Sequence, residues 1–138
     1  MKDLTGLYRG TIRRHAANPV GYGSEIDATH RNEADNPLCG DRVMLFLRIV
    51  DGQVEAAAFE GEACAICMAS ASILCATVPG HSLQYLQDRY SDLLGALQGN
   101  GELDQQDPLA PLLGVKAYPS RIRCATLPWS AAAGVIRS

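Results

Sequence analysis

The sequence predicts an α+β fold, in which a small antiparallel sheet of three strands carries helices packed on one of its faces. Alternating apolar residues flank the pair Asp51-Gly52, which is the strongest short hairpin signal in the chain. From residue 63 onward the apolar residues recur at helical spacing instead, so the strands come first and most helices follow. A length of 138 residues fits one domain spanning residues 1–138.

The first half of the chain is expected to form one helix and the sheet. Leu4 to Ala17 has a helical apolar stripe, which Asn18-Pro19 and two glycines then end. A first strand is predicted from Ser24 to Arg31. Apolar and polar residues alternate over Arg42 to Val50 and again over Gln53 to Glu60, which predicts the two strands of a hairpin.

The second half is expected to be helical. An Ala-rich helix is predicted from Ala63 to Thr77, and Ser82 can cap the next one, whose leucines follow helical spacing. Gly99 to Pro108 is a polar connection. The remaining expectations are a short helical turn over Pro111 to Val115 and a helix over Ser120 to Ala132 that Pro128 kinks or restarts.

Composition narrows the class of protein. The chain is 47% hydrophobic and 20% charged, which is ordinary for a soluble globular protein. Its net charge of -3 argues against nucleic-acid binding, which normally needs a basic face. No apolar run reaches the roughly 20 residues that span a bilayer, and the first residues lack a signal-peptide core, so we expect a cytoplasmic protein with no membrane partner.

Five cysteines need a physical explanation. Their odd number and the absence of an export signal argue against a disulfide framework, because the cytosol keeps thiols reduced. Three interpretations are open for each cysteine: metal ligation, sulfur or redox chemistry, and burial as a small hydrophobic residue.

Cys39 and Cys64 are predicted to be neighbours although they lie far apart in the sequence. Cys39 belongs to the turn-rich stretch 36–41 before the hairpin, and Cys64 lies at the start of the helix after it. A hairpin brings its two outer ends together, and Asp41 can point into the same pocket from the loop. The helix N-terminus also favours the thiolate form of Cys64, because unpaired backbone N–H groups and the helix dipole stabilise negative charge there.

The other candidates have less specific signals. Cys75 lies eleven residues after Cys64, about 16 Å along a helix, so we expect it in the core. Cys67 forms a lone CxxC with Cys64; it could reach the same metal, but a structural role is favoured. No histidine has a spacing to the cysteines that indicates ligation; these are His15, His30 and His81.

Three segments of the chain together resemble one family. The stretch 36–41, Asn-Pro-Leu-Cys-Gly-Asp, resembles the N-P-x-C-G-D loop of the IscU and NifU-type iron–sulfur cluster assembly proteins. Residues 59–72 are similar to the second cysteine motif of that family, and residues 121–127, which hold Cys124, are similar to the third. The opening stretch 8–23 also resembles the N-terminal helix and turn of the family, so the likeness covers nearly the whole chain.

The details are similar to the SufU branch of the family. The polar connection Gly99 to Pro108 resembles a SufU-type insertion, and Arg123 precedes the third cysteine as it does in SufU-like proteins. Ala117 to Arg121 stands where IscU-like proteins carry a Leu-Pro-Pro-Val-Lys chaperone site, so no dedicated Hsp70 partner is expected. The resemblance implies the SufE/NifU-like, IscU-type version of the α+β fold.

The resemblance also implies a site and a reaction. Its metal ligands would be Cys39, Asp41, Cys64 and Cys124, a donor set that suits tetrahedral zinc. Cys39, on a loop with a glycine, would be the sulfur acceptor, and Arg123 would gate the site or meet the partner. At most, the protein would be a zinc-dependent sulfurtransferase that takes sulfur from a SufS-type cysteine desulfurase containing pyridoxal phosphate and passes it to downstream Suf proteins.

Two alternatives remain open at this point. The same cysteines could hold a nascent [2Fe–2S] cluster on a scaffold protein, because thiolates are also the ligands of such clusters. The site could also be a closed, structural zinc site in a domain that only binds partners.

Overall fold

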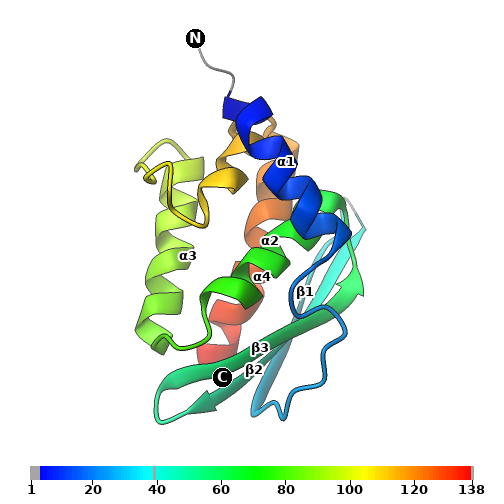
Figure 1. Cartoon of the computed structure of the whole chain (residues 1–138), viewed down its shortest axis with the longest axis vertical. Helices are drawn as coiled ribbons and strands as arrows, with labels where there is room; N and C mark the ends of the chain where they lie inside the picture. The colour runs from blue at the N-terminus through cyan, green and yellow to red at the C-terminus, as the bar shows by residue number, and fades with distance from the viewer. Residues whose placement is uncertain (1–3, 39, 138) are drawn as a thin grey trace.

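In the computed structural model, which describes residues 4–38 and 40–137, one helix precedes the sheet and the other helices follow it (Figure 1). The elements are, in chain order, α1 (Leu4–Ala17), β1 (His30–Asn36), β2 (Asp41–Val50), β3 (Gln53–Glu62), α2 (Ala65–Thr77), α3 (Leu83–Leu97), the 3₁₀ helix η1 (Ala110–Ala117) and α4 (Pro119–Arg137). The predicted α+β class is confirmed.

The sheet is antiparallel, with strand order β1-β2-β3. Its hairpin turns where the sequence predicted, since Asp51 and Gly52 have φ angles of 52° and 76°, as a primed two-residue turn requires. On β2, Val43, Leu45 and Leu47 point into the core and are fully buried, while the residues between them are more exposed. This alternation defines the face that the helices cover.

The predicted first strand, Ser24 to Arg31, is wrong: β1 is His30–Asn36. The inward positions of β1 are Asn32, Ala34 and Asn36, so the strand shows no apolar alternation in the sequence. Its polar inward groups form hydrogen bonds instead; the Asn32 side-chain amide donates to the carbonyl of Ala131 at 3.0 Å. Tyr22, just before the predicted strand, belongs to no strand and pairs with Phe59 of β3 through an isolated bridge.

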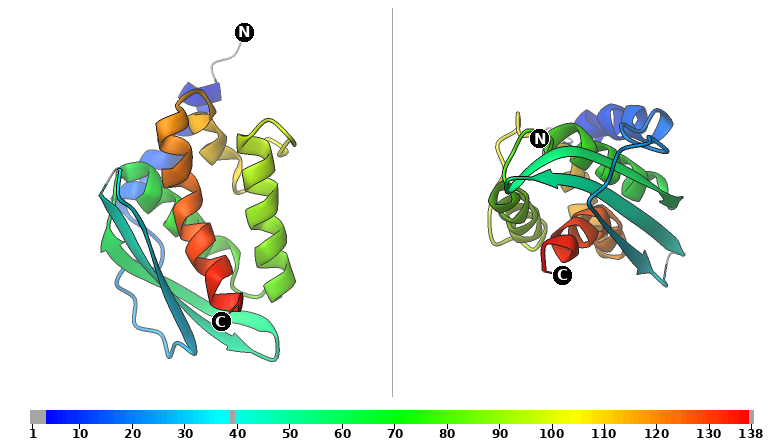
Figure 2. Two further views of the ribbon diagram at one scale, coloured as in Figure 1. Left: turned by 180° about the vertical axis from the view of Figure 1, so that it is seen from behind. Right: turned by 90° about the horizontal axis from the view of Figure 1, so that it is seen from below.

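The helices pack on one face of the sheet (Figure 2). α4 packs on β1 and β2, and α2 packs on β3, so these two helices cover the apolar face. α1 lies against α2, and α3 lies against α4. The core between these layers contains Trp129, the largest fully buried side chain.

Of the two expected effects of Pro128, a kink or a restart of the last helix, the restart is wrong, because α4 is one helix with Pro128 inside it. The packing of α4 against β1, β2, α2 and α3 holds the helix together in spite of the missing backbone donor. Among the described residues, no helix is both long and apolar enough to cross a bilayer.

Candidate metal centre

Asp41 lies at the first position of β2, where the sheet meets the β1–β2 loop. It pairs with Asn36 across the sheet, and its side chain is almost completely buried, with 2% exposed. One carboxylate oxygen, Oδ1, accepts a hydrogen bond from the backbone N–H of Cys64 at 2.8 Å. The other, Oδ2, is buried and has no hydrogen-bond partner among the described residues. A buried carboxylate oxygen without a donor is costly, unless a cation completes its coordination.

Cys64 is the N-cap residue of α2. Its Sγ accepts a hydrogen bond from the backbone N–H of Cys67 at 3.5 Å, as an N-cap side chain does. The helix therefore begins two residues later than predicted, at Ala65, and the thiol sits at the positive end of the helix dipole. Cys64 is partly exposed, whereas Asp41 is buried, so the site can be approached from the Cys64 side.

Cys124 reaches the same place from α4. Proline at the first helical position starts this helix at Pro119, and Cys124 follows in its second turn, fully buried. The Ser70 hydroxyl of α2 donates a hydrogen bond to the carbonyl of Ala125, which fixes α4 against α2 next to Cys124.

Three potential ligand atoms converge here, one each from Asp41, Cys64 and Cys124, and all lie within 4.8 Å of one another. This spacing is close to that of sulfur and oxygen donors that share one tetrahedral zinc, which lie roughly 3.5 Å apart. Two thiols and the Asp41 carboxylate, whose Oδ2 has no partner among the described residues, thus fit a thiophilic cation, and zinc in particular. Within residues 4–38 and 40–137, no other group of this kind occurs.

Cys39, the remaining predicted ligand and the predicted sulfur acceptor, lies outside the described residues. Hydrogen bonds to Asn36 hold the described residues on either side of Cys39. Asn36 is buried, its side-chain Oδ1 accepts from the N–H of Leu38, and its carbonyl accepts from Gly40. Leu38, the last described residue before Cys39, is 94% exposed.

Arg123, the predicted gating residue, is exposed on α4. No ion pair between Arg123 and Asp41 occurs among the described residues. Of the two Asp41 oxygens, Oδ1 accepts from the Cys64 N–H, and Oδ2 has no described partner. A role of Arg123 toward a partner protein stays a prediction.

The two remaining cysteines lie in the hydrophobic core, as the sequence indicated. Cys67 is fully buried, and its thiol is not part of the group of converging ligands. Burial raises the pKa of the Cys75 thiol to about 12, so this thiol is inert at neutral pH. Gly21 lies directly on Cys75 with a φ of 81°, and an added Cβ there would lie 2.9 Å from the Cys75 Cβ.

Gly61 contributes to the site in a way that sequence reasoning missed. It has a φ of 143° and pairs across the β2–β3 ladder with Val43, which is two residues after Asp41 in β2. A Cβ at this position would overlap the carbonyl oxygen of Arg42, so only glycine lets the strands approach this closely beside the centre. The sequence did offer one signal for this role: a glycine directly after the predicted strand Gln53 to Glu60, three residues before the candidate ligand Cys64.

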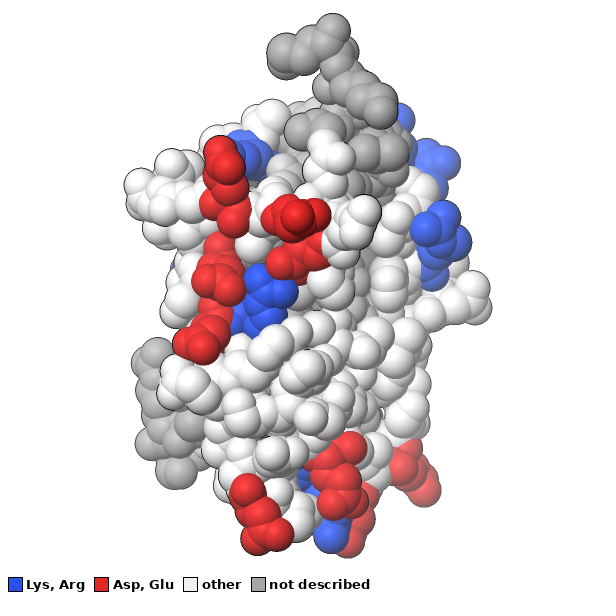
Figure 3. Space-filling model, turned by 60° about the vertical axis from the view of Figure 1, so that its left-hand side comes forward, with Lys and Arg blue, Asp and Glu red and all other residues white. Residues whose placement is uncertain are grey.

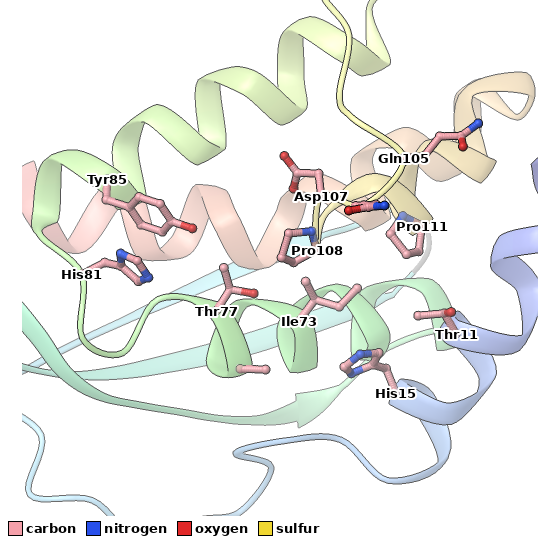
Figure 4. A pocket seen from close by; sticks show the side chains of 12 residues that line it. Thr11, His15, Ile73, Thr77, His81, Tyr85, Gln105, Asp107, Pro108 and Pro111 are labelled. Atoms are coloured by element: carbon pink, nitrogen blue, oxygen red, sulfur yellow. The ribbon is translucent and has the colours of Figure 1, made fainter.

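A separate cavity of about 680 Å³ lies between α1, α2, α3 and the connection to η1 (Figure 4). Its α2 residues include Ile73 and Thr77, nine or more residues from Cys64, so it is distinct from the metal centre. On its α1 side, His15 Nδ1 lies 2.7 Å from the Ser72 hydroxyl, which also accepts from the Val20 N–H. Burial, and secondarily the neighbouring Arg14, lowers the pKa of His15. His15 is thus a partly buried histidine whose ring nitrogen has a hydrogen-bond partner within the protein.

The fold and the converging side chains together define a class: an α+β domain in which two thiols and a carboxylate that could hold a metal ion lie between a sheet end and two helices. Residues 7–125 match the family model of the NifU-like N-terminal domain, and the chain belongs to this family.

Two relatives illustrate the range of the family. The chain is 36% identical to the zinc-dependent sulfurtransferase SufU of Bacillus subtilis over 132 residues, which cover 94% of this chain and 88% of the relative. It is 31% identical to the iron-sulfur cluster assembly scaffold protein IscU of Streptococcus pyogenes serotype M1, over 95% of this chain and 83% of the relative.

Solved structures agree with this placement. A NifU-like protein (N-terminal) from Brucella abortus superposes with a TM-score of 0.86 at 25% identity, covering 99% of this chain and 96% of that one. A putative iron-sulfur cluster assembly scaffold protein for the SUF system from Fervidobacterium islandicum gives a TM-score of 0.81 at 25% identity, covering 91% and 93%.

Proposed function

We propose that this protein acts in iron–sulfur cluster assembly as a zinc-dependent sulfur acceptor, which takes persulfide sulfur from a cysteine desulfurase and passes it on. The observation that carries the proposal is the convergence of Asp41, Cys64 and Cys124 around a buried carboxylate oxygen that has no donor. The similarity to a relative named as a zinc-dependent sulfurtransferase supports the same role.

The transfer step follows ordinary thiol–disulfide chemistry. A thiolate of this protein attacks the outer sulfur of the donor persulfide, a new S–S bond forms, and the donor cysteine leaves as its thiolate. The step needs no oxidant, because the sulfur arrives already at the persulfide level. Zinc, when bound by the proposed ligands, would keep the thiols deprotonated at neutral pH.

We assign the acceptor role to Cys39, on the sequence argument together with the exposure of its described neighbour Leu38. The neighbouring Leu38 is 94% exposed, whereas Cys124 is fully buried in α4. An acceptor must reach the active site of another protein, and a loop residue can do so with little cost to the fold.

The acceptor assignment is tested by persulfide mapping. After incubation with a cysteine desulfurase and cysteine, the protein is alkylated and its peptides are analysed by mass spectrometry. The added sulfur should lie on the peptide containing Cys39, and Cys39→Ala should lose both the modification and the stimulation of cysteine turnover. A persulfide mainly on Cys64 or Cys124 would contradict the assignment.

The desulfurase partner is expected to be of the SufS type, and Arg123 is the residue we assign to meeting it. An exposed guanidinium can form a bidentate pair with a partner carboxylate. Arg123→Ala should therefore keep its zinc and accept sulfur several-fold more slowly. Unchanged stimulation of the desulfurase by this variant would remove Arg123 from the mechanism.

A scaffold on which a [2Fe–2S] cluster is built is the second candidate. The similarity to a relative named as a scaffold favours it, because cysteine thiolates ligate such clusters equally well. Metal analysis of protein purified without oxygen separates the two candidates. Zinc with a persulfide on Cys39 supports transfer, whereas iron with sulfide and no persulfide supports the scaffold.

A further inference from the structure

A second cavity, of about 500 Å³, opens between α1, α2, η1 and the start of α4. Two kinds of side chain line it: the long arginines Arg9, Arg13 and Arg121, and apolar groups that include Ile12, Ile66, Val115 and Tyr118. The Tyr118 side chain is 54% exposed, so part of the apolar wall faces solvent.

This cavity adjoins the metal centre. Ala65 and Ile66, which line it, directly follow Cys64 in α2. Arg121, on its opposite wall, precedes Cys124 by three residues, and positions three apart on a helix are neighbours on its surface. A molecule seated in the cavity would therefore lie beside both the partly exposed and the buried thiol.

Three arginines and no carboxylate residue line the cavity, although the protein has a net charge of -3. α1 carries Arg9, Arg13 and Arg14 and no carboxylate. Among the described residues, Arg9 and Arg13 take part in no ion pair. Figure 3 shows acidic side chains gathered instead over α3 and the connection after it, where Arg89 alone pairs with Asp92 and Asp107.

The positive charge has a consequence for sulfur transfer. Three thiolates and one carboxylate around Zn²⁺ leave a formal charge of about -2 at the centre, and a donor persulfide is itself an anion. Like charges repel strongly at the short range that transfer requires. Arginines at the rim offset this repulsion and attract an acidic partner surface.

We propose that this arginine-lined cavity receives a segment of the sulfur-donating desulfurase that carries a carboxylate beside an apolar side chain. The carboxylate would pair with Arg9, Arg13 or Arg121, and the apolar side chain would pack on Ile66 and Tyr118. The inference rests on the proposed sulfur-accepting function and adds the surface that positions the donor.

Charge reversal with a matched control tests the inference. Arg13→Glu changes a cavity residue, whereas Arg14→Glu makes the same charge change on the same helix at an exposed position that lines neither cavity. The dissociation constant for the desulfurase is measured by titration calorimetry for zinc-loaded proteins. At low salt, Arg13→Glu should raise it about tenfold or more and Arg14→Glu less than about threefold. At high salt, where charge interactions are screened, the dissociation constants of the two variants should become similar. Equal effects of the two variants would overturn the inference.

A photo-crosslinking amino acid at position 118 provides an independent readout. It should capture the desulfurase, and mass spectrometry should place the crosslink on a segment that contains Asp or Glu. The control position is Val50, which is exposed at the far end of β2, about 30 Å from Asp41, and should capture none. If wild-type protein accepts sulfur while position 118 captures no desulfurase, the docking surface is wrong and the function stands. If wild-type protein accepts no sulfur, the proposed function itself fails.

Discussion

Asp41 has two separable tasks, and substitutions can measure each. Its Oδ1 satisfies the N–H of Cys64, and its Oδ2 is available to a metal. Asp41→Asn keeps an oxygen for the N–H but removes the negative charge, whereas Asp41→Ala removes both. The two variants should therefore behave alike toward zinc and differently in stability without metal.

The magnitudes follow from the contacts. A hydrogen bond to a charged acceptor contributes about 1.5 to 3 kcal/mol, so metal-free Asp41→Ala should lose about 2 kcal/mol of unfolding free energy. Metal-free Asp41→Asn should stay within about 1 kcal/mol of wild type. Structural zinc binds with roughly 10 to 16 kcal/mol, so one ligand of four carries roughly 3 kcal/mol, or about 100-fold in affinity.

Urea denaturation in the presence of a chelator gives the stabilities, and competition with a chromophoric chelator gives the zinc affinities. Zinc bound by Asp41→Asn as tightly as by wild type would show that Asp41 is not a ligand. Equal metal-free stability of wild type and Asp41→Ala would show that the bond to the Cys64 N–H contributes nothing.

Two further predictions follow from the pKa shifts. The Cys75 thiol, with its pKa raised to about 12, should resist iodoacetamide at pH 8 in the native protein and react after unfolding. Labelling of native Cys75 at the rate of a free thiol would refute its burial. Because the pKa of His15 is lowered on folding, the unfolded chain binds more protons, so stability should fall as the pH drops below about 6.5, the ordinary value, toward the lowered one. His15→Gln should flatten this loss between pH 7 and 5 in urea titrations, and an identical pH dependence of the two proteins would remove His15 as its source.

Elements with a clear apolar period were predictable from the sequence. The hairpin Arg42 to Glu60 and its Asp51-Gly52 turn follow directly from alternation and turn chemistry, and the Ser82 cap of α3 is observed, with its hydroxyl accepting from the Tyr85 N–H. β1 could not be found in this way, because its inward side chains include two asparagines whose hydrogen-bond partners lie in α4 and in the adjoining loop. Tertiary partners of polar residues leave no periodic signal.

The site was predictable in part. The neighbourhood of Asp41 and Cys64 follows from hairpin geometry, and the structure joins them by a direct hydrogen bond. Cys124 could not be placed by local reasoning, because only the packing of α4 across the sheet brings it there, and its inclusion depended on the family resemblance. Gly61 and Ser70 act through close backbone approach and a hydrogen bond between helices, neither of which is visible in a linear pattern.

The bond between the Asp41 carboxylate and the Cys64 N–H has a consequence for metal exchange. It links the first residue of β2 to the cap of α2 with protein atoms alone, and the helix packing around Cys124 likewise needs no ion. The metal-free chain should therefore keep its fold and present a half-assembled set of ligands, unlike small zinc domains that unfold when the ion is removed. A fold that stands without the ion would let a ligand position be given up and regained repeatedly, as the proposed sulfur-accepting role requires.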